Sequence, residues 1–262
     1  MKPIISGIAL FVLSMASLKA ATEEGAMKPF TPAKDVKGSW AMHVDPALPN
    51  VLILGDSISI GYTRPVRKLL DGKANVFRPM KASGTKPENC GDTPMGVRGI
   101  DRWLGSTKWD VIHFNWGLWD LCYRNPESKT QGKRDKKNGT LSTTPEQYEK
   151  NLETMVNRLK KTGAELIWAS TTLVPEGEAG RIVGDDIKYN AIAERVMKRH
   201  GIPTDDLHAL TVSFDGKYFS GPGNVHFTEE GSQRLAEQVA EKISGLLEKK
   251  TKPDPEPELP PR

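Results

Sequence analysis

The sequence predicts an α/β protein, a three-layer α/β/α sandwich around a mainly parallel sheet. Short apolar runs that are typical of buried strands alternate along the chain with longer stretches whose apolar residues recur at helical spacing. Elements that alternate in this way build parallel sheets whose two faces are covered by helices. With 37% hydrophobic and 27% charged residues, the chain of 262 residues has the composition of a globular protein with one main core.

Strands and helices are expected in regular alternation along the chain. The clearest element is the helix over residues 145–162, in which Pro145 follows the N-cap candidate Thr144 and Gly163 ends the helix. The expected strands are residues 51–54, 75–79, 110–116 and 164–170, and the other helices run from the turn at 55–57 to residue 70 and over 96–104, 185–200 and 228–247.

The carboxyl ends of the strands are where a sheet of this kind binds its ligands. The segments that follow the strands are therefore where functional residues are expected. These segments are residues 55–60, 81–96, 117–145 and 171–184, together with the residues before the last helix.

The first 21 residues have the features of a secretory signal peptide. Lys2 precedes an apolar run of about ten residues, and small residues that include Ala20 and Ala21 follow it. The run is too short for a membrane anchor, which needs about 20 apolar residues. We therefore expect a mature chain that begins near Ala21 or Thr22, has no integral membrane segment, and is secreted or periplasmic.

Three further regions are expected after the signal peptide. Residues 22–48 lack sustained periodicity and are interpreted as an N-terminal leader segment, and residues 49–248 form the folded domain. The tail over residues 249–262 is rich in proline and charge, so it is expected to be disordered.

The chain contains only two cysteines, Cys90 and Cys122. Export to an oxidising compartment would permit a disulfide between them. Because both follow predicted strands, we expect this disulfide to tie together two loops at the ligand-binding edge of the sheet.

The charge distribution argues against a nucleic-acid partner. The net charge is only +4, and the densest basic run, residues 129–137, has no interleaved aromatic residues. This run is interpreted as a solvated loop. No metal-binding cluster or cofactor motif is found in the sequence, so neither a metal nor a cofactor is expected.

Ser57 is the first candidate for a catalytic residue. It lies in the run Gly55-Asp-Ser57, where a buried strand ends and a helix begins. A serine in this turn is lifted out of the sheet, and its backbone N–H lies at a helix start, where it can stabilise an oxyanion. The alternative is ordinary turn and N-cap chemistry, in which Gly-Asp-Ser is common.

His226 is the second candidate, and it immediately precedes the last predicted helix, which has Thr228 as its expected N-cap. Imidazole is the side chain best suited to accept a proton from serine near neutral pH. The remaining histidines, in the leader, in a strand, at a helix end and in a polar segment, are expected to be structural.

Together, Gly55-Asp-Ser-Ile-Ser59 near the start and Val225-His-Phe-Thr228 near the end resemble the first and last sequence blocks of the SGNH (GDSL-type) hydrolases. The resemblance covers roughly residues 51–247. It implies a flavodoxin-like α/β/α sandwich and a serine esterase with Ser57 as nucleophile and His226 as general base.

Further site residues are implied by the middle blocks of this family. The glycine of the second block corresponds to Gly91, which the resemblance assigns to the oxyanion hole together with the Ser57 N–H, and Gly84 is the rival position. Trp119 occupies the slot of the third block's asparagine, so the third oxyanion donor is either Trp119 itself or the nearby Asn115.

The last block also departs from the family pattern, because Gly223 stands where an aspartate usually precedes the histidine. We expect Asn224 or a backbone carbonyl to orient His226 instead, with Asp120 and Asp215 as other carboxylates of unknown position. On this basis Asn224→Ala should cause a modest loss of activity, and Gly223→Asp should leave the rate unchanged or higher.

The expected function is therefore that of an exported serine esterase. The resemblance implies removal of small acyl groups such as acetate from a small-molecule or carbohydrate ester substrate, and Trp116 or Trp119 could stack on a sugar ring. The alternative is a catalytically degenerate, SGNH-like carbohydrate-binding protein, favoured by the replacements at positions 119 and 223.

Overall fold

A computed structural model of the protein describes residues 40–127 and 133–251. The expected signal peptide, most of the leader segment and the tail beyond residue 251 lie outside the described residues. The central sheet has five parallel strands in the order β2-β1-β3-β6-β7. Numbered along the sheet's own strands, this is the order 2-1-3-4-5 of a flavodoxin-like fold, as the sequence predicts.

The elements follow one another in the predicted alternation. The strands of the central sheet are β1 (Asn50–Leu54), β2 (Asn75–Phe77), β3 (Val111–Phe114), β6 (Glu165–Ala169) and β7 (Thr204–Asp205). The α-helices are α1 (Ser57–Leu69), α2 (Thr93–Leu104), α3 (Pro145–Lys160), α4 (Asp185–His200), α5 (Leu207–Val212) and α6 (Glu229–Thr251).

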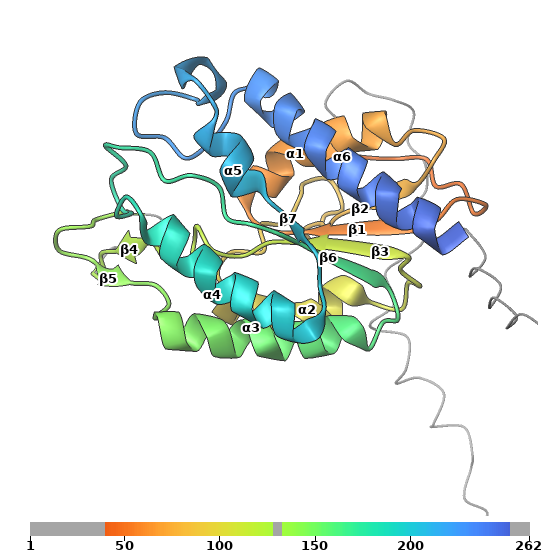
Figure 1. The fold of residues 1–262 in the computed structure, drawn as a ribbon, viewed down its shortest axis with the longest axis horizontal. Helices are drawn as coiled ribbons and strands as arrows, with labels where there is room; N and C mark the ends of the chain where they lie inside the picture. The colour runs from red at the N-terminus through yellow and green to blue at the C-terminus, as the bar shows by residue number, and fades with distance from the viewer. Residues whose placement is uncertain (1–39, 128–132, 252–262) are drawn as a thin grey trace, which may run out of the picture.

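The helices form two layers on opposite faces of the sheet. Helices α1 and α6 pack against each other on one face, and α2, α3 and α4 pack in sequence on the other (Figure 1). This arrangement confirms the predicted three-layer sandwich. In the described part of the chain, no helix is long and apolar enough to cross a membrane.

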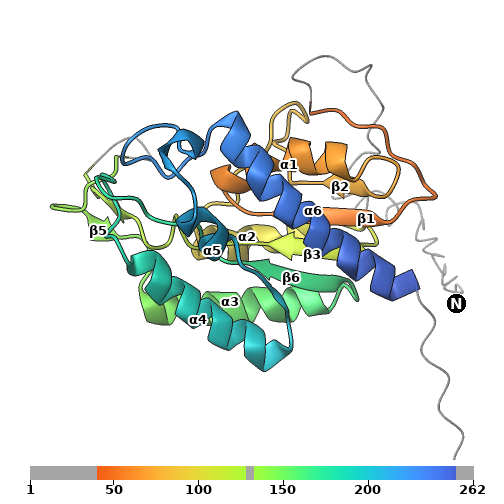
Figure 2. The same ribbon diagram turned by 45° about the horizontal axis from the view of Figure 1, so that its top comes forward.

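Several short elements were not predicted from the sequence. They are strand β7, helix α5, a 3₁₀ helix (Gly216–Tyr218), and a two-stranded antiparallel hairpin of β4 (Tyr123–Arg124) and β5 (Thr140–Leu141). Each has too few residues to show a hydrophobic period. The hairpin lies beyond the carboxyl ends of the central strands (Figure 2).

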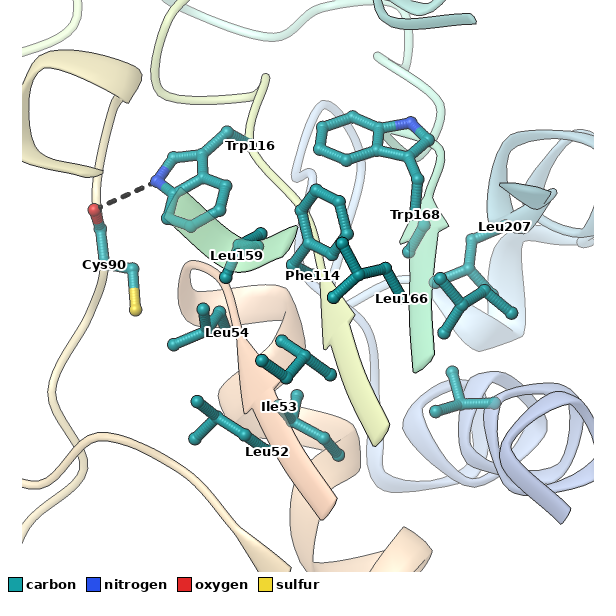
Figure 3. Close-up of a cluster of buried hydrophobic side chains, with 14 of the residues drawn as sticks. Leu52, Ile53, Leu54, Cys90, Phe114, Trp116, Leu159, Leu166, Trp168 and Leu207 are labelled. Atoms are coloured by element: carbon teal, nitrogen blue, oxygen red, sulfur yellow. Dashed lines mark hydrogen bonds between the residues drawn. The ribbon is translucent and has the colours of Figure 1, made fainter. Parts of the chain in front are cut away.

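The core lies between the sheet and its helices. The strand residues Leu52, Ile53 and Leu54 are buried there, and so are Phe114 and Trp168, which pack edge to face with their ring centroids 5.4 Å apart (Figure 3). Such burial is the main term that stabilises a fold of this size. The core therefore holds β1 and β3 rigidly, and both end at the site described below.

Helices α1 and α6 approach closely at Gly61. A Cβ atom placed on Gly61 would lie 3.0 Å from Ser232 Oγ and 3.8 Å from Ser232 Cβ. Only the hydroxyl would be crowded, since 3.8 Å is an ordinary van der Waals distance. The missing side chain at Gly61 thus allows α6 to pack tightly on α1, which begins at Ser57.

A double-mutant cycle tests this contact. Alanine favours a helix over glycine by about 1 kcal/mol, so Gly61→Ala should stabilise the Ser232→Ala protein by about that amount. In the wild-type background the gain should be smaller by at least about 0.5 kcal/mol, because the new methyl group meets the hydroxyl. Chemical denaturation of the four proteins measures both values. Equal gains in the two backgrounds would contradict close packing at Gly61.

Candidate active site

Ser57 is the first residue of α1, directly after the carboxyl end of β1. Asp56 caps the helix, because its carboxylate accepts a hydrogen bond of 2.9 Å from the Ile58 N–H. Burial raises the pKa of Asp56, while the Ile58 N–H and the nearby charges of Arg181 and His226 oppose the rise. The cap leaves the Ser57 N–H at the helix start, where it has no intrahelical acceptor.

His226 is brought to Ser57 by the loop that precedes α6. Its Nε2 lies 2.9 Å from Ser57 Oγ, although the two residues are 169 positions apart in the sequence. The loop is held on both sides of the imidazole, because the Ser220 N–H donates to the His226 carbonyl and Phe219 bridges to Phe227. This is the distance at which a histidine can accept the proton of a serine hydroxyl.

Asn224 contacts the opposite nitrogen of the same ring. Asn224 Oδ1 lies 2.9 Å from His226 Nδ1 and also accepts the His226 backbone N–H at 3.0 Å. An acceptor at Nδ1 favours the tautomer with hydrogen on Nδ1, which leaves Nε2 free to accept from Ser57. An amide oxygen therefore occupies the orienting position.

The electrostatic surroundings of His226 lower its pKa. Partial desolvation is the largest cause, and the charges of Arg181 and Arg134 act in the same direction, whereas Asp56 and Glu178 act against them. The lowered pKa keeps the imidazole neutral at neutral pH, which is the form a general base needs.

Gly91 lies beside the turn that carries Ser57. The preceding Cys90 N–H donates to the Gly55 carbonyl at 3.2 Å, which fixes the loop against the end of β1. The Gly91 N–H itself donates to Asn89 Oδ1 at 2.8 Å, so a substrate oxygen would have to replace that acceptor. The rival Gly84 lies in a separate turn in which its N–H bonds Lys81.

Gly91 also requires the absence of a side chain. Its φ is +62°, and an added Cβ would lie 2.3 Å from Met95 Sδ. A residue with a side chain would be strained in this left-handed conformation and would clash with the first turn of α2.

A buried ion-pair network lies near His226 and was not predicted from the sequence. Glu178 is fully buried, and its Oε1 accepts from Arg134 at 2.5 Å and from Arg181 at 3.0 Å. Arg181 also donates from Nε to the Leu118 carbonyl at 2.6 Å. The only feature of the sequence that pointed to Glu178 and Arg181 was their position in residues 171–184, which follow a predicted strand.

The sequence predicted that the basic run over residues 129–137 is a solvated loop. In the described part of this run, however, two side chains contact Glu178. Arg134 pairs with Glu178, and Lys136 Nζ donates to the Glu178 carbonyl at 2.7 Å. Residues 129–132 of the run lie outside the described residues. The described half therefore docks on the loop beside the active site.

Comparison with known proteins agrees with this arrangement. Residues 53–234 match the family model of the GDSL-like lipases and acylhydrolases. The chain belongs to the GDSL-like lipase/acylhydrolase family. It is accordingly a serine hydrolase that acts on esters. A search of curated protein sequences found no match.

Solved structures share the fold at low sequence identity. An acetyl xylan esterase superposes with a TM-score of 0.57 at 16% identity, covering 74% of this chain and 99% of the other. A lipase/acylhydrolase from Enterococcus faecalis gives 0.58 at 17% identity, with 76% and 96% covered. A GDSL-like lipase from Bacteroides thetaiotaomicron gives 0.54 at 15% identity, with 75% and 88% covered.

Gly223, in the place of the family's aspartate, has a structural reason to be glycine. Its φ is +65°, and an added Cβ would lie 2.7 Å from the Gly177 carbonyl oxygen. A side chain at this position would therefore be strained, which argues against the expectation that Gly223→Asp leaves the rate unchanged or higher. Asp120 does not supply the missing acid, because its buried carboxylate binds Thr93, and Asp215 caps the 3₁₀ helix.

Half-buried Trp119 stands at the sequence position where the third block of the GDSL family has an asparagine. The Arg124 guanidinium lies over this indole, 4.5 Å from the ring centroid. Asn115 donates its side-chain amide to the Ala169 carbonyl at 2.8 Å, so it links neighbouring strands. Trp116 is fully buried and donates to the Cys90 carbonyl, which excludes it from stacking on a sugar (Figure 3).

The predicted disulfide between Cys90 and Cys122 is wrong. Both thiols are free and buried. They also lie in different surroundings, because Cys90 packs in the main core near Arg78, whereas Cys122 lies near Arg181 and Arg124. Burial raises the pKa of Cys90 to about 12, so this thiol is unreactive at neutral pH.

Substitutions of Gly223 test the interpretation of the missing acid. Both Gly223→Asp and Gly223→Ala should lower the free energy of unfolding by about 1–2 kcal/mol, because each imposes a left-handed backbone on a residue with a Cβ. Both should also lower turnover of an aryl acetate at least about tenfold, because the displaced loop carries Asn224 and His226.

The matched control is Gly216→Ala, since Gly216 has open space around its Cβ position. This variant should behave as the wild type in denaturation and turnover. A Gly223→Asp protein with wild-type stability and an increased rate would show that the loop tolerates the acid after all.

Proposed function

We propose that this enzyme is an exported esterase that removes small acyl groups, such as acetate, from carbohydrate, with Ser57 as nucleophile and His226 as general base. The observation that carries the catalytic assignment is the chain of contacts from Ser57 Oγ to His226 Nε2 and from Nδ1 to Asn224, each 2.9 Å. This geometry is that of a serine activated by an oriented imidazole.

The reaction follows in two steps from this geometry. Ser57 Oγ attacks the acyl carbon while its proton passes to His226 Nε2, and the imidazolium then gives that proton to the leaving alcohol. Water next attacks the acyl-serine by the same proton path in reverse. The N–H groups of Ser57 and Gly91 are the proposed donors to the oxyanion in both steps.

The amide at Asn224 favours esters over peptides. In place of an aspartate it orients the imidazole, but it stabilises the imidazolium with a dipole rather than a full charge. An alkoxide leaving group requires less assistance from a strong general acid than an amine does. We therefore assign esterase activity without peptidase activity.

Two observations support a carbohydrate ester as the substrate. One of the proteins that share the fold is an acetyl xylan esterase. In addition, Trp119 is only partly buried and follows Leu118, whose carbonyl binds Arg181. A partly exposed indole can pack against the apolar face of a sugar ring. The alternative of a degenerate binding protein has less support, because Ser57 and His226 are already within hydrogen-bond distance.

Alanine substitutions test the catalytic assignment. Ser57→Ala and His226→Ala should each lower turnover of an aryl acetate by at least about 10³-fold, because the two groups act as a unit. A serine-directed fluorophosphonate should label the wild-type protein at Ser57 and should not label Ser57→Ala, as read by mass spectrometry. Unlabelled wild-type protein with an intact fold would favour the binding alternative.

The pH profile provides an independent check of the same assignment. Activity should rise with pH as His226 loses its proton, and the inflection should lie below the ordinary histidine value of about 6.5 because the pKa is lowered. The rate should then be level through neutral pH. A rate that is constant between about pH 4 and pH 8 would exclude His226 as the base.

Export rests on the sequence of the first 21 residues, with Lys2, the apolar run and the small residues near Ala21. Expression of the full chain in a bacterial host should yield protein outside the cytoplasm whose first residue is Ala21, Thr22 or a close neighbour. N-terminal sequencing measures this directly. Uncleaved protein confined to the cytoplasm would overturn the proposal.

A further inference from the structure

Three arginines form a cluster beside the catalytic pair, and we call Arg124, Arg134 and Arg181 the arginine cluster. They come from two segments, since Arg124 and Arg134 face each other in an antiparallel bridge and Arg181 precedes α4. Arg134 and Arg181 share Glu178, and Arg124 lies on Trp119.

The cluster has more positive charge than the protein neutralises. Glu178 is its only carboxylate partner among the described residues, and both oxygens of that group are used, Oε1 by two guanidinium groups and Oε2 by the Gly180 N–H at 2.7 Å. Three guanidinium groups therefore share one negative charge. Within the described chain Arg124 has no ion pair, and its contact is with the indole of Trp119.

Two members of the cluster, Arg134 and Arg181, lie near His226. Arg181 binds the carbonyl of Leu118, the residue before Trp119, at 2.6 Å. The backbone of the Glu178 loop also packs against Gly223, three residues before His226. The charges of Arg181 and Arg134 act on the His226 imidazole in the same direction as desolvation, the largest cause of its lowered pKa, and against Asp56 and Glu178. A substrate bound at Ser57 therefore lies within the field of these arginines.

The three members of the cluster have different exposures. The Arg181 side chain is only 5% exposed, so its role is to hold the loops together. The Arg134 side chain is 38% exposed, and Arg124 is partly exposed on the indole. Stacking on an aromatic ring orients a guanidinium while leaving its N–H groups available at the edge.

We propose that the natural substrate is an acyl ester of an acidic carbohydrate, and that Arg124, assisted by Arg134, binds the anionic group of the sugar. This inference rests on the proposed function and names its substrate class. A guanidinium binds a carboxylate or a sulfate through paired N–H groups, so either group satisfies the chemistry. Trp119 orients Arg124 and provides the apolar wall next to it.

Matched substrates test the inference with the intact enzyme. The probes are the acetylated methyl glycoside of glucuronic acid with a free carboxylate, the acetylated methyl glucoside and the 6-sulfate of the acetylated glucoside, with 4-nitrophenyl acetate as the small neutral reference. At low ionic strength kcat/KM should be at least about tenfold higher for an acidic sugar than for the neutral one, mainly through KM. This preference should shrink as salt is raised to about 0.5 M, because salt screens the attraction.

Variants of Arg124 test whether this residue recognises the anionic group of the sugar. The ratio of kcat/KM for acidic over neutral sugar should fall towards one in Arg124→Gln and below one in Arg124→Glu. The matched control is Arg195→Gln, which removes one positive charge on α4, where Arg195 pairs with Glu149 at 3.7 Å. This control should keep the wild-type ratio, and circular dichroism verifies the fold of each variant.

The outcomes separate this inference from the proposed function. Preference for the uronate alone, for the sulfate alone or for both supports the inference and identifies the anionic group. Equal kcat/KM for acidic and neutral sugars overturns the inference, and so does an acidic preference that survives Arg124→Glu. In either case, esterase activity on 4-nitrophenyl acetate leaves the proposed function standing. Absence of activity on every ester, including 4-nitrophenyl acetate, overturns both.

Discussion

The packing of α1 against α6 is the constraint on which the active site depends. Helix α1 begins at Ser57, and the loop with His226 leads into α6, so the relative position of the two helices sets the distance between Ser57 Oγ and His226 Nε2. The close approach at Gly61 and Ser232 lies one turn into each helix. Rigid elements on one face of the sheet thus bring together groups from opposite ends of the domain, at a precision that mobile loops alone rarely reach.

The departures from the family pattern are explained by their neighbours in space. At Gly223 the Gly177 backbone fills the space where a side chain would begin, so the orienting group has moved to Asn224. At Trp119 the indole supports Arg124 instead of providing a side-chain amide. Both positions lie beside the loop around Glu178. The backbone of this loop packs against Gly223, and its Arg181 binds the carbonyl of Leu118, the residue before Trp119. One loop therefore contacts the chain at or next to both positions where the family's usual residues are replaced.

The same loop contributes to the electrostatic balance of the site, because it carries Glu178 and Arg181. Partial desolvation is the largest cause of the lowered pKa of His226, the charges of Arg181 and Arg134 act in the same direction, and Asp56 and Glu178 act against them. The resulting lower pKa keeps the base neutral but also makes it a weaker base, as expected for chemistry on esters rather than amides. Arg134 and Arg181 also belong to the arginine cluster, so the proposed anion-binding group includes residues whose charges act on the imidazole.

The alternation of apolar runs and helical periods by itself determined the α/β/α architecture. The glycine and serine after β1 and the histidine before α6 indicated Ser57 and His226, which the structure places within hydrogen-bond distance. These are local signals, in which a few neighbouring residues specify a strand end or a helix start. The sequence also suggested a disulfide, which the structure excludes because the two thiols are buried in different surroundings. Strand β7 and the hairpin were missed because two-residue strands have no period. Only the tertiary structure decided why Gly223 is glycine and that Arg134, Glu178 and Arg181 meet beside His226, because these contacts join segments whose sequence separation gives no indication of their distance in space.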